Sequence, residues 1–399
     1  MSSPRQPLRT ALIGLSSSAV TSWAAGAHLP NLLTPAGKSK YAISALLNSS
    51  VDAAKAAIKV YDLPPSTKAY GSPEDLAKDP DIDVVICNTR VDKHYETILP
   101  SIRAGKDVYV EWPIASNLTH IDELVQAAKQ SGSRVAVGLQ GRWQPPLIKI
   151  REILHEQKLG KVLSVEVRAF GGTIGREILP SGLKYFADRK IGGNPITIGF
   201  AHLFDSVLST VGDIDPGSVH TKLQLQRPDI RIRDPESGKI VETITSTVPD
   251  LLSLHGSLKK APHTASAATL SLFFRRGGPF PGTPALTLSI ALEKGEIRYV
   301  VPSGLALMSA KPDEPVTITI HNFDTDKTED VPWEYTSEQK EVNDRAKGVL
   351  TCLYAFADGL DAATRNEEGE RGWVSLEDAA DRARLIESFL KRWEESGAQ

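Results

Sequence analysis

The chain has little of what would mark a secreted, metal-binding or membrane protein. Its 399 residues include two cysteines, Cys87 and Cys352, each within an apolar run. A disulfide scaffold is therefore excluded, and both cysteines are expected to be buried, reduced thiols. No Cys-x-x-Cys or Cys/His cluster indicates a metal site. No apolar run reaches the roughly 18 residues of a membrane-spanning helix, and no signal-peptide pattern opens the sequence. These absences predict a cytoplasmic protein.

An excess of charge of one sign is also lacking. The formal net charge is -3 at pH 7, with charged residues making up 24% of the chain. Because the basic residues are scattered, neither nucleic acid nor a membrane is expected as a partner. The hydrophobic fraction of 41% is that of a globular protein, and 399 residues are enough for two domains, each with its own core.

Residues 1–145 alternate between short apolar runs and amphipathic stretches. The first of these runs lie at residues 10–15, 41–48, 83–89 and 107–113. Their Val/Ile/Leu continuity is typical of parallel strands buried on both faces. Ser72, which precedes a proline, is expected to cap one intervening helix, and Gly105 to end another. This alternation predicts a doubly wound parallel sheet, an N-terminal domain of residues 1–145.

The pattern changes after residue 145. Strand-like runs joined by Gly/Pro turns lie at 161–172, 220–226, 268–275, 285–294, 296–304 and 316–323. Because no regular helices separate the later runs, they predict an open, mainly antiparallel sheet. Two helices are expected at 341–360 and 375–395, the second capped by Ser375. Residues 225–265 are interpreted as mostly loop. Residues 146–399 are thus predicted to form a second α/β domain for substrate binding and oligomerisation, whose terminal helices can pack back on the first domain.

A glycine- and serine-rich run, GLSSSA, follows the first predicted strand at residues 14–19. In the G-x-G-x-x-G/A fingerprint, small residues let the backbone approach a pyrophosphate at a helix N-terminus. Gly14 and Ala19 match this pattern, and Ser16 replaces the second glycine. The run predicts a nicotinamide dinucleotide site, with an ordinary strand-to-helix turn as the alternative. The predicted contacts in it are Gly14, Ser16, Ser17, Ser18 and Ala19.

The second predicted strand ends at Asn48, Ser49 and Ser50, without the acid that binds a ribose 2′-hydroxyl in NAD-selective sites. The cofactor is therefore predicted to be NADP or NAD, with NADP preferred. Ligands of such sheets bind outside the carboxyl ends of the strands. Further cofactor contacts are accordingly expected at Asn88, Thr89, Arg90, His94, Glu111, Trp112, Pro113 and Gln140. For His94, capping of a helix is favoured over a contact with the cofactor.

Five segments in this order carry a resemblance that covers nearly the whole chain. They are GLSSSA (14–19), CNTRVDKHYE (87–96), VEWP (110–113), GLQGRW (138–143) and GGNPITIGFAHLFD (192–205). The chain resembles the glucose–fructose oxidoreductase/inositol dehydrogenase/rhizopine catabolism (Gfo/Idh/MocA) family. Within it, LKYFAD (183–188) and TVPDLL (247–252) resemble the fungal branch that includes the repressor of the yeast galactose pathway. The resemblance implies a Rossmann domain, and a second domain whose sheet forms a homodimer or higher homo-oligomer.

The resemblance also implies a catalytic site, from which this chain departs. Family enzymes carry a Glu-Lys-Pro motif, where this sequence has Glu111, Trp112 and Pro113. They also place an aspartate four residues before a histidine, where this sequence has Ile198 before His202. Hydride transfer from an alcohol needs a group that exchanges the hydroxyl proton. That role is assigned to His202, with Tyr185 and Lys184 as helpers, and a packed helix histidine as the alternative. The predicted substrate pocket consists of Trp112, Arg142, Trp143, Thr197 and Ile198.

Two functions follow. The favoured one is an NAD(P)-dependent oxidoreductase acting on a sugar-like, polyol or carbonyl/imine small metabolite, with Trp112 in place of the family lysine. The alternative is a catalytically silent dinucleotide-binding regulatory protein, like the repressor. The residue pair Arg275–Arg276 has two interpretations as well, a solvated strand end or a contact for phosphate or carboxylate.

Overall fold

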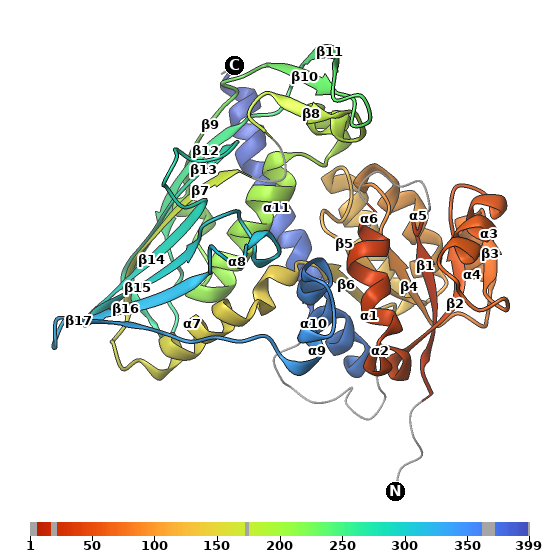
Figure 1. Ribbon diagram of the computed structural model, residues 1–399, viewed down its shortest axis with the longest axis horizontal. Helices are drawn as coiled ribbons and strands as arrows, with labels where there is room; N and C mark the ends of the chain where they lie inside the picture. Colours follow the sequence, from red (N-terminus) through yellow and green to blue (C-terminus); the bar gives the residue numbers. More distant parts are fainter. Residues whose placement is uncertain (1–5, 17–21, 172–174, 361–371, 398–399) are drawn as a thin grey trace, which may run out of the picture. The chain divides into compact units, whose positions relative to one another are not determined.

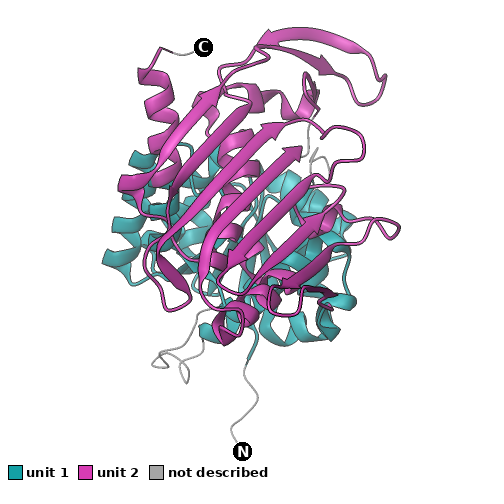
Figure 2. Ribbon diagram, turned by 90° about the vertical axis from the view of Figure 1, so that its left-hand side faces the viewer, with its two compact units in different colours: residues 1–140, 335–384 teal, residues 141–334, 385–399 magenta. Residues whose placement is uncertain are grey.

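The computed structural model describes residues 6–16, 22–171, 175–360 and 372–397. The chain divides into two compact units (Figure 2), each built from two stretches of sequence. Unit 1 contains residues 1–140 and 335–384, and unit 2 contains residues 141–334 and 385–399. The last helix, α11 (Leu376–Glu395), contributes its first residues to unit 1 and the rest to unit 2.

Unit 1 is built on a sheet of seven strands (Figure 1) in the order β18-β6-β5-β4-β1-β2-β3. The strands are β1 (Leu8–Ile13), β2 (Tyr41–Leu47), β3 (Lys68–Tyr70), β4 (Val84–Cys87), β5 (Asp107–Glu111), β6 (Val135–Gly138) and β18 (Val374–Ser375). Strands β1 to β6 are parallel, and β18 pairs antiparallel with β6. Six parallel strands in the order 3-2-1-4-5-6 make a Rossmann sheet. The predicted doubly wound domain is confirmed.

The helices of unit 1 begin and end largely where the sequence predicts. They are α1 (Leu29–Leu33), α2 (Pro35–Lys40), α3 (Val51–Val60), α4 (Pro73–Lys78), α5 (Val91–Arg103), α6 (Leu118–Ser131), α9 (Ser337–Lys340) and α10 (Asp344–Gly359). Ser72 caps α4 by accepting a bond from the Asp75 backbone. Gly105 follows the end of α5 with a positive φ of 75°. The Ser375 hydroxyl likewise accepts from the backbone N–H of Asp378. These predicted caps and the predicted stop are confirmed.

The segment after β1 departs from a regular helix. Ala24–His28 form a π-helical turn, η1, that runs directly into α1. Helix α10 packs against this segment, and the Asn31 side chain donates to the Ala346 carbonyl at 2.9 Å. π-helical turns insert an extra residue into a helix and often lie at functional sites. Here the turn ends at His28, a residue buried beneath the sheet edge described below.

Unit 2 is built on a sheet of eight strands in the order β17-β16-β15-β14-β7-β13-β12-β9. The strands are β7 (Val162–Gly171), β9 (His220–Gln224), β12 (Leu251–Ser257), β13 (Thr264–Arg276), β14 (Leu286–Leu292), β15 (Gly295–Val301), β16 (Thr317–Asn322) and β17 (Lys327–Asp330). Every neighbouring pair is antiparallel except β7 and β13. This confirms the predicted open, mainly antiparallel sheet.

The two faces of this sheet differ. Alternate residues of each central strand are buried, as in β14, where Leu286, Leu288, Ile290 and Leu292 share one face. Helices α7 (Pro145–Glu156) and α8 (Ala201–Val211) belong to this unit, and α8 is preceded by the π-helical turn η5 (Pro195–Phe200). Phe200 and Phe274 pack edge to face, which places η5 on the buried face. Among the described residues, no helix covers the face turned to the viewer in Figure 2.

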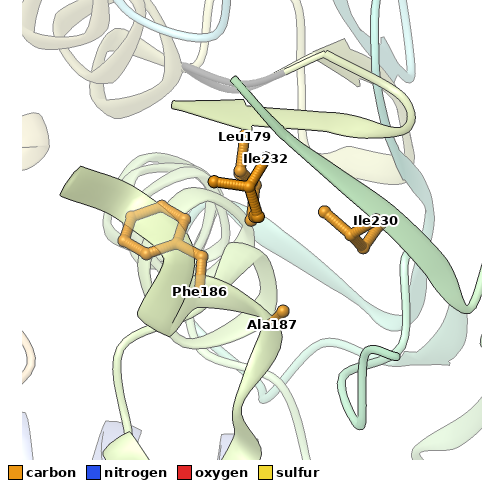
Figure 3. Close-up of a cluster of buried hydrophobic side chains, with 5 residues drawn as sticks. All are labelled: Leu179, Phe186, Ala187, Ile230 and Ile232. Atoms are coloured by element: carbon orange, nitrogen blue, oxygen red, sulfur yellow. The ribbon is translucent and has the colours of Figure 1, made fainter. Parts of the chain in front are cut away.

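The stretch 225–265, interpreted from the sequence as mostly loop, is instead rich in strands. It contains β10 (Asp229–Arg233), β11 (Ile240–Thr245) and β12, so that prediction was wrong. Strand β10 pairs with both β11 and β8 (Ile178–Pro180) in a small separate sheet. Ile230 and Ile232 point into a cluster with Leu179, Phe186 and Ala187 (Figure 3), whereas the charged residues that alternate with them along β10 are exposed. The sequence of β10 does alternate apolar and polar residues, but its high charge led to its interpretation as a loop.

Both cysteines are buried and neither forms a disulfide bond, as predicted. Burial raises the pKa of Cys87 to about 11, so this thiol stays protonated and unreactive at neutral pH. None of the helices in the described ranges combines the length and apolar character needed to cross a bilayer.

Candidate functional site

Gly14 lies at the carboxyl end of β1, in the centre of the Rossmann sheet. Its φ is +86°, a left-handed conformation that side chains disfavour. A Cβ built on it would lie 3.1 Å from the backbone carbon and oxygen of Asn88 and from the Thr89 methyl group. The first fingerprint position therefore has a glycine because the chain after β4 comes so close. Ser17, Ser18 and Ala19, the other fingerprint residues, lie outside the described residues.

The loop after Gly14 is held by two side chains from the neighbouring βα segment. The amide nitrogen of Asn48 donates to the Leu15 carbonyl at 2.9 Å, and the Tyr61 hydroxyl donates to the Ser16 carbonyl at 3.0 Å. Ser50 caps α3 through the Ala53 N–H, and Ser49 is exposed. Tyr61 was missed from the sequence, because nothing in its helix indicates that it reaches back to the first strand.

Asn88 follows β4 next to Gly14 and has an unusual environment. Its side-chain oxygen and nitrogen are both screened from solvent, and neither has a hydrogen-bond partner among the residues that the structure describes. An unpaired buried amide costs about 1–3 kcal/mol per group, so such groups call for an explanation. A dinucleotide offers both donors and acceptors at this edge of the sheet. The cradle at Gly14 and the unpaired amide of Asn88 therefore fit NAD(P).

Two other predicted contacts near this edge differ in their surroundings. Arg90 forms a two-bond ion pair with Asp92, at 2.5 and 2.7 Å. Gln140, which follows β6, has a buried side-chain oxygen without a partner. Of these two predicted contacts, Gln140 thus offers an acceptor to a ligand, whereas the Arg90 guanidinium is already engaged.

Glu111 ends β5 and forms a buried pair with His28. Its Oε1 lies 2.6 Å from Nε2 of His28, and the two side chains are 10% and 0% exposed. In the tautomer of His28 that is protonated at Nε2, the ring donates to this carboxylate oxygen. A Cβ on Gly138, the residue opposite Glu111 in β6, would lie 2.6 Å from the carboxylate. His28 and Gly138 were both missed from the sequence, since their partners lie on other strands and helices.

His94 joins the segments that follow β4 and β5. Its Nδ1 lies 2.9 Å from the Pro113 carbonyl and its Nε2 lies 2.8 Å from the Thr89 carbonyl. The role that the sequence favoured for it, capping a helix, is wrong: Arg90 is the N-cap of α5, and the ring contacts carbonyls rather than free N–H groups. Trp112 is buried, and the Trp112–Pro113 peptide bond is cis. Together, His28 and His94 hold the Glu-Trp-Pro segment from two sides.

The buried position of His94 predicts a pH dependence of stability. Burial lowers the pKa of His94 below its ordinary value of 6.5, although the Thr89 and Pro113 carbonyls oppose this. The unfolded chain therefore binds a proton on this ring at higher pH than the folded chain does. We expect the free energy of unfolding to fall as the pH decreases below about 6.5. Denaturant unfolding from pH 8 to 5 measures this. The free energy of unfolding should depend less on pH in His94→Gln than in the wild type, whereas the exposed control His220→Gln should match the wild type. Equal pH dependence in all three proteins would contradict the role of His94.

In unit 2, His202 lies in the first turn of α8 and is half-buried. Thr197 donates its hydroxyl to the Gly192 carbonyl at 2.7 Å and forms a capping box with Asn194. Ile198 packs against the apolar cluster of the small sheet, together with Tyr185. Of this predicted set, His202 is the group that can exchange a proton near neutral pH.

The remaining predicted residues of unit 2 are tied into local interactions. Lys184 pairs with Glu242 of β11 through bonds of 2.7 and 2.8 Å. Arg142 forms a two-bond ion pair with Asp205, whose side chain is 1% exposed. Trp143, the residue after Arg142, is half-buried. Roles for Lys184, Arg142 and Trp143 in substrate binding stay predictions.

Comparison with known proteins agrees with this geometry. Residues 8–139 match the model of the oxidoreductase family with an NAD-binding Rossmann fold, and residues 145–300 match the Gal80p C-terminal domain. The chain is 32% identical to dehydrogenase aclE of Aspergillus oryzae over 283 residues, covering 69% of this chain and 72% of that protein. It is 26% identical to the galactose/lactose metabolism regulatory protein GAL80 of Saccharomyces cerevisiae over 310 residues, covering 76% and 69%. The structure of the transcriptional regulator Gal80p from Kluyveromyces lactis superposes with a TM-score of 0.82 at 22% identity, covering 99% and 94%.

Proposed function

This chain belongs to the Gfo/Idh/MocA oxidoreductase family, with a C-terminal domain of the Gal80p type, and on that premise we propose that it is an NAD(P)-dependent oxidoreductase. The observation that carries the proposal is the Asn88 amide, buried and unpaired beside the Gly14 cradle. The lack of an acid at residues 48–50 supports a preference for NADP over NAD.

The proposed substrate is a sugar-like, polyol or carbonyl/imine small metabolite. A bound nicotinamide supplies or accepts hydride. In the oxidation of an alcohol, the carbon loses hydride and the oxygen loses a proton, and we assign that proton to the imidazole of His202. Trp112 stands where the family has a lysine that binds the substrate hydroxyl. The missing ammonium group favours substrates that carry more of their own activation, such as imines and enones.

The test of this proposal separates binding from turnover. We expect NADH and NADPH to bind the purified protein, measured by nicotinamide fluorescence, and a screen of sugars, polyols, carbonyls and imines to reveal cofactor oxidation or reduction. His202→Ala should then lower the rate by about 100-fold or more without changing cofactor affinity, because it removes the proton-exchanging group. His155→Ala, an exposed helix histidine of the same unit, is the control. An unchanged rate in His202→Ala would remove His202 from the mechanism.

A regulatory protein without turnover is the second candidate. It is favoured by Trp112 and by Ile198, which packs into an apolar cluster where the family has an aspartate. The relation to GAL80, a regulatory protein, is compatible with it. Binding of NADH or NADPH without turnover of any substrate in the screen would support this function over the first. Failure to bind either cofactor would contradict both.

We also propose that the chain forms a homodimer or higher homo-oligomer through the eight-stranded sheet. The open face of that sheet carries small and polar side chains, among them Ser271, Thr287 and Ser289. Such a flat face can pair with a second copy. Light scattering on the purified chain, with Ser289→Arg as the disrupting variant, tests this; a monomeric wild type would contradict it.

A further inference from the structure

Strands β7 and β13 run parallel and leave the large sheet of unit 2 side by side. Their ends meet in a bridge between Gly171 and Gly277. Gly277 has a φ of +82°, and a Cβ on it would overlap the side chain of Arg176. The turn therefore needs glycine so that Arg176 can lie across it. Arg275 and Arg276 directly precede this turn, so three arginines lie at or next to it; the charge of Arg176 acts on Arg275.

These three arginines have no carboxylate partner. Among the described residues, no aspartate or glutamate oxygen lies within 4 Å of the guanidinium groups of Arg176, Arg275 or Arg276, whereas the neighbouring acids are already engaged. Glu177 pairs with Arg227 at 3.1 Å and with Arg231 at 3.5 Å. The Asp250 carboxylate accepts the backbone N–H groups of residues 226 and 227. None of the described carboxylates thus forms an ion pair with these arginines, although the charges of Asp250 and Glu177 act on Arg276.

The hydrogen-bonding capacity of the arginines is also largely unused. A guanidinium has five N–H donors. Arg176 uses one on the Gly278 carbonyl and Arg276 one on the Gly175 carbonyl, both at 2.8 Å, while Arg275 makes two long bonds of 3.3 and 3.5 Å. Arg276 is 5% exposed, and its Nη2 is buried without a partner. It is not a solvated strand end, as one interpretation of the sequence had it.

The guanidinium of Arg275, which is partly exposed, is held in place by an aromatic ring. The Arg275 guanidinium lies 4.9 Å from the centre of the Phe170 ring, and that of Arg168 lies 5.7 Å from the same ring. Stacking on an aromatic ring fixes the plane of a guanidinium and leaves its edge donors available. Burial, and then the charges of Arg176 and Arg227, lower the pKa of Arg275, as expected for cations held close together. An oxyanion would relieve this repulsion and fill the open donors.

We propose that the turn at Gly277, with Arg176 and Arg275 as the accessible forks and the buried Arg276 next to them in the chain, binds an oxyanion. The ligand chemistry is a phosphate or carboxylate group carrying more than one negative charge, free or as part of a small metabolite. The proposal is independent of the proposed catalytic function, because all of its residues belong to unit 2, whereas the predicted cofactor contacts belong to unit 1.

The experiment uses the full chain and two probes, inorganic phosphate and malonate, at constant ionic strength set by KCl. We expect at least one probe to raise the midpoint of thermal unfolding saturably. Arg275→Ala and Arg176→Ala should weaken the apparent affinity by at least about tenfold, because each removes a charge-assisted fork. Arg298→Ala, an exposed arginine on β15 of the same sheet, should leave it unchanged.

Each outcome bears on the proposal. The wild type can respond to phosphate alone, to malonate alone or to both. If this rise of the unfolding midpoint is lost in the two variants, it supports the proposal and identifies the group that the site prefers. Arg275→Lys, which keeps the charge and loses the fork, should be intermediate, and it guards against a folding defect in Arg275→Ala. Equal responses in all variants, no response to either probe, or a response abolished by saturating NADH would overturn the proposal, the last because it would place the anion in the dinucleotide loop.

Discussion

Gly14→Ala is expected to weaken NADH and NADPH binding by on the order of 30-fold, about 2 kcal/mol. The added methyl group would lie 3.1 Å from the Asn88 carbonyl and from the Thr89 side chain, closer than carbon normally approaches. Either the loop after β1 or the segment after β4 must move, and both are proposed to contact the cofactor. Fluorescence titration of the variant with both cofactors measures the loss.

The control must separate this crowding from backbone strain. Gly132, at the end of α6 in the same unit, has a φ of +76°, close to the +86° of Gly14, but nothing lies within 4 Å of a Cβ placed on it. Gly132→Ala therefore adds a similar strain of about 1 kcal/mol without a collision. It should lower stability and leave cofactor affinity intact. If both variants bind cofactor as the wild type does, the Gly14 turn is not the pyrophosphate site.

Glu111→Ala is expected to destabilise the folded chain by about 3 kcal/mol, the largest stability effect of the substitutions considered. It removes a hydrogen-bonded partner that lies 2.6 Å from a histidine with 0% exposure. Since Nδ1 of His28 already lacks a partner, both ring nitrogens would then be buried and unsatisfied. Removing one member of a buried, paired set typically costs this much because the other is left desolvated. Urea unfolding at pH 7 gives the difference directly.

Glu111→Gln is the matched control for that loss. The amide keeps an oxygen that can accept from Nε2 of His28, in a side chain of nearly the same size, so most of the stability should return. A loss in Glu111→Gln as large as in Glu111→Ala would show that the charge rather than the hydrogen bond matters. Full stability of Glu111→Ala would mean that the pair contributes nothing, contrary to the geometry.

The strands and turns of both domains were predictable because their signals are local. A run such as Val84–Cys87 is continuously apolar and buried on both faces, and Ser72 caps the helix that follows it in the predicted way. Strand β10 was not predicted, although Ile230 and Ile232 alternate with polar residues as in a half-buried strand. Its exposed positions carry Asp229, Arg231 and Arg233, and this charge resembles that of a loop. The apolar cluster that holds the strand is formed by residues about 50 positions away, which a local pattern does not contain.

The site was predictable to a different degree in each unit. Gly14, Asn88 and Glu111 follow strands, and parallel strands end at one edge, so their proximity follows from topology. The role of His94 was misjudged, because two carbonyls from different loops define it. In unit 2, packing was the more common role expected for an aromatic residue such as Tyr185, but nothing in the sequence indicated that Ile198 would pack against the cluster of the small sheet. Nor did the sequence distinguish buried Arg276 from exposed Arg298.

Resemblance to known proteins indicated the family. The sequence by itself determined the doubly wound first domain, the antiparallel second sheet and the glycine turn after the first strand. Each of these depends on periodicity, turn residues or spacing along a short stretch of chain. Only the tertiary structure decided which polar groups find partners: His28 reaches Glu111 across 83 positions, whereas within the described ranges the Asn88 side chain has no hydrogen-bond partner and the arginines at Gly277 form no ion pair. Hydrogen bonding and charge compensation depend on distances of a few ångströms between remote residues, and folding alone sets those distances.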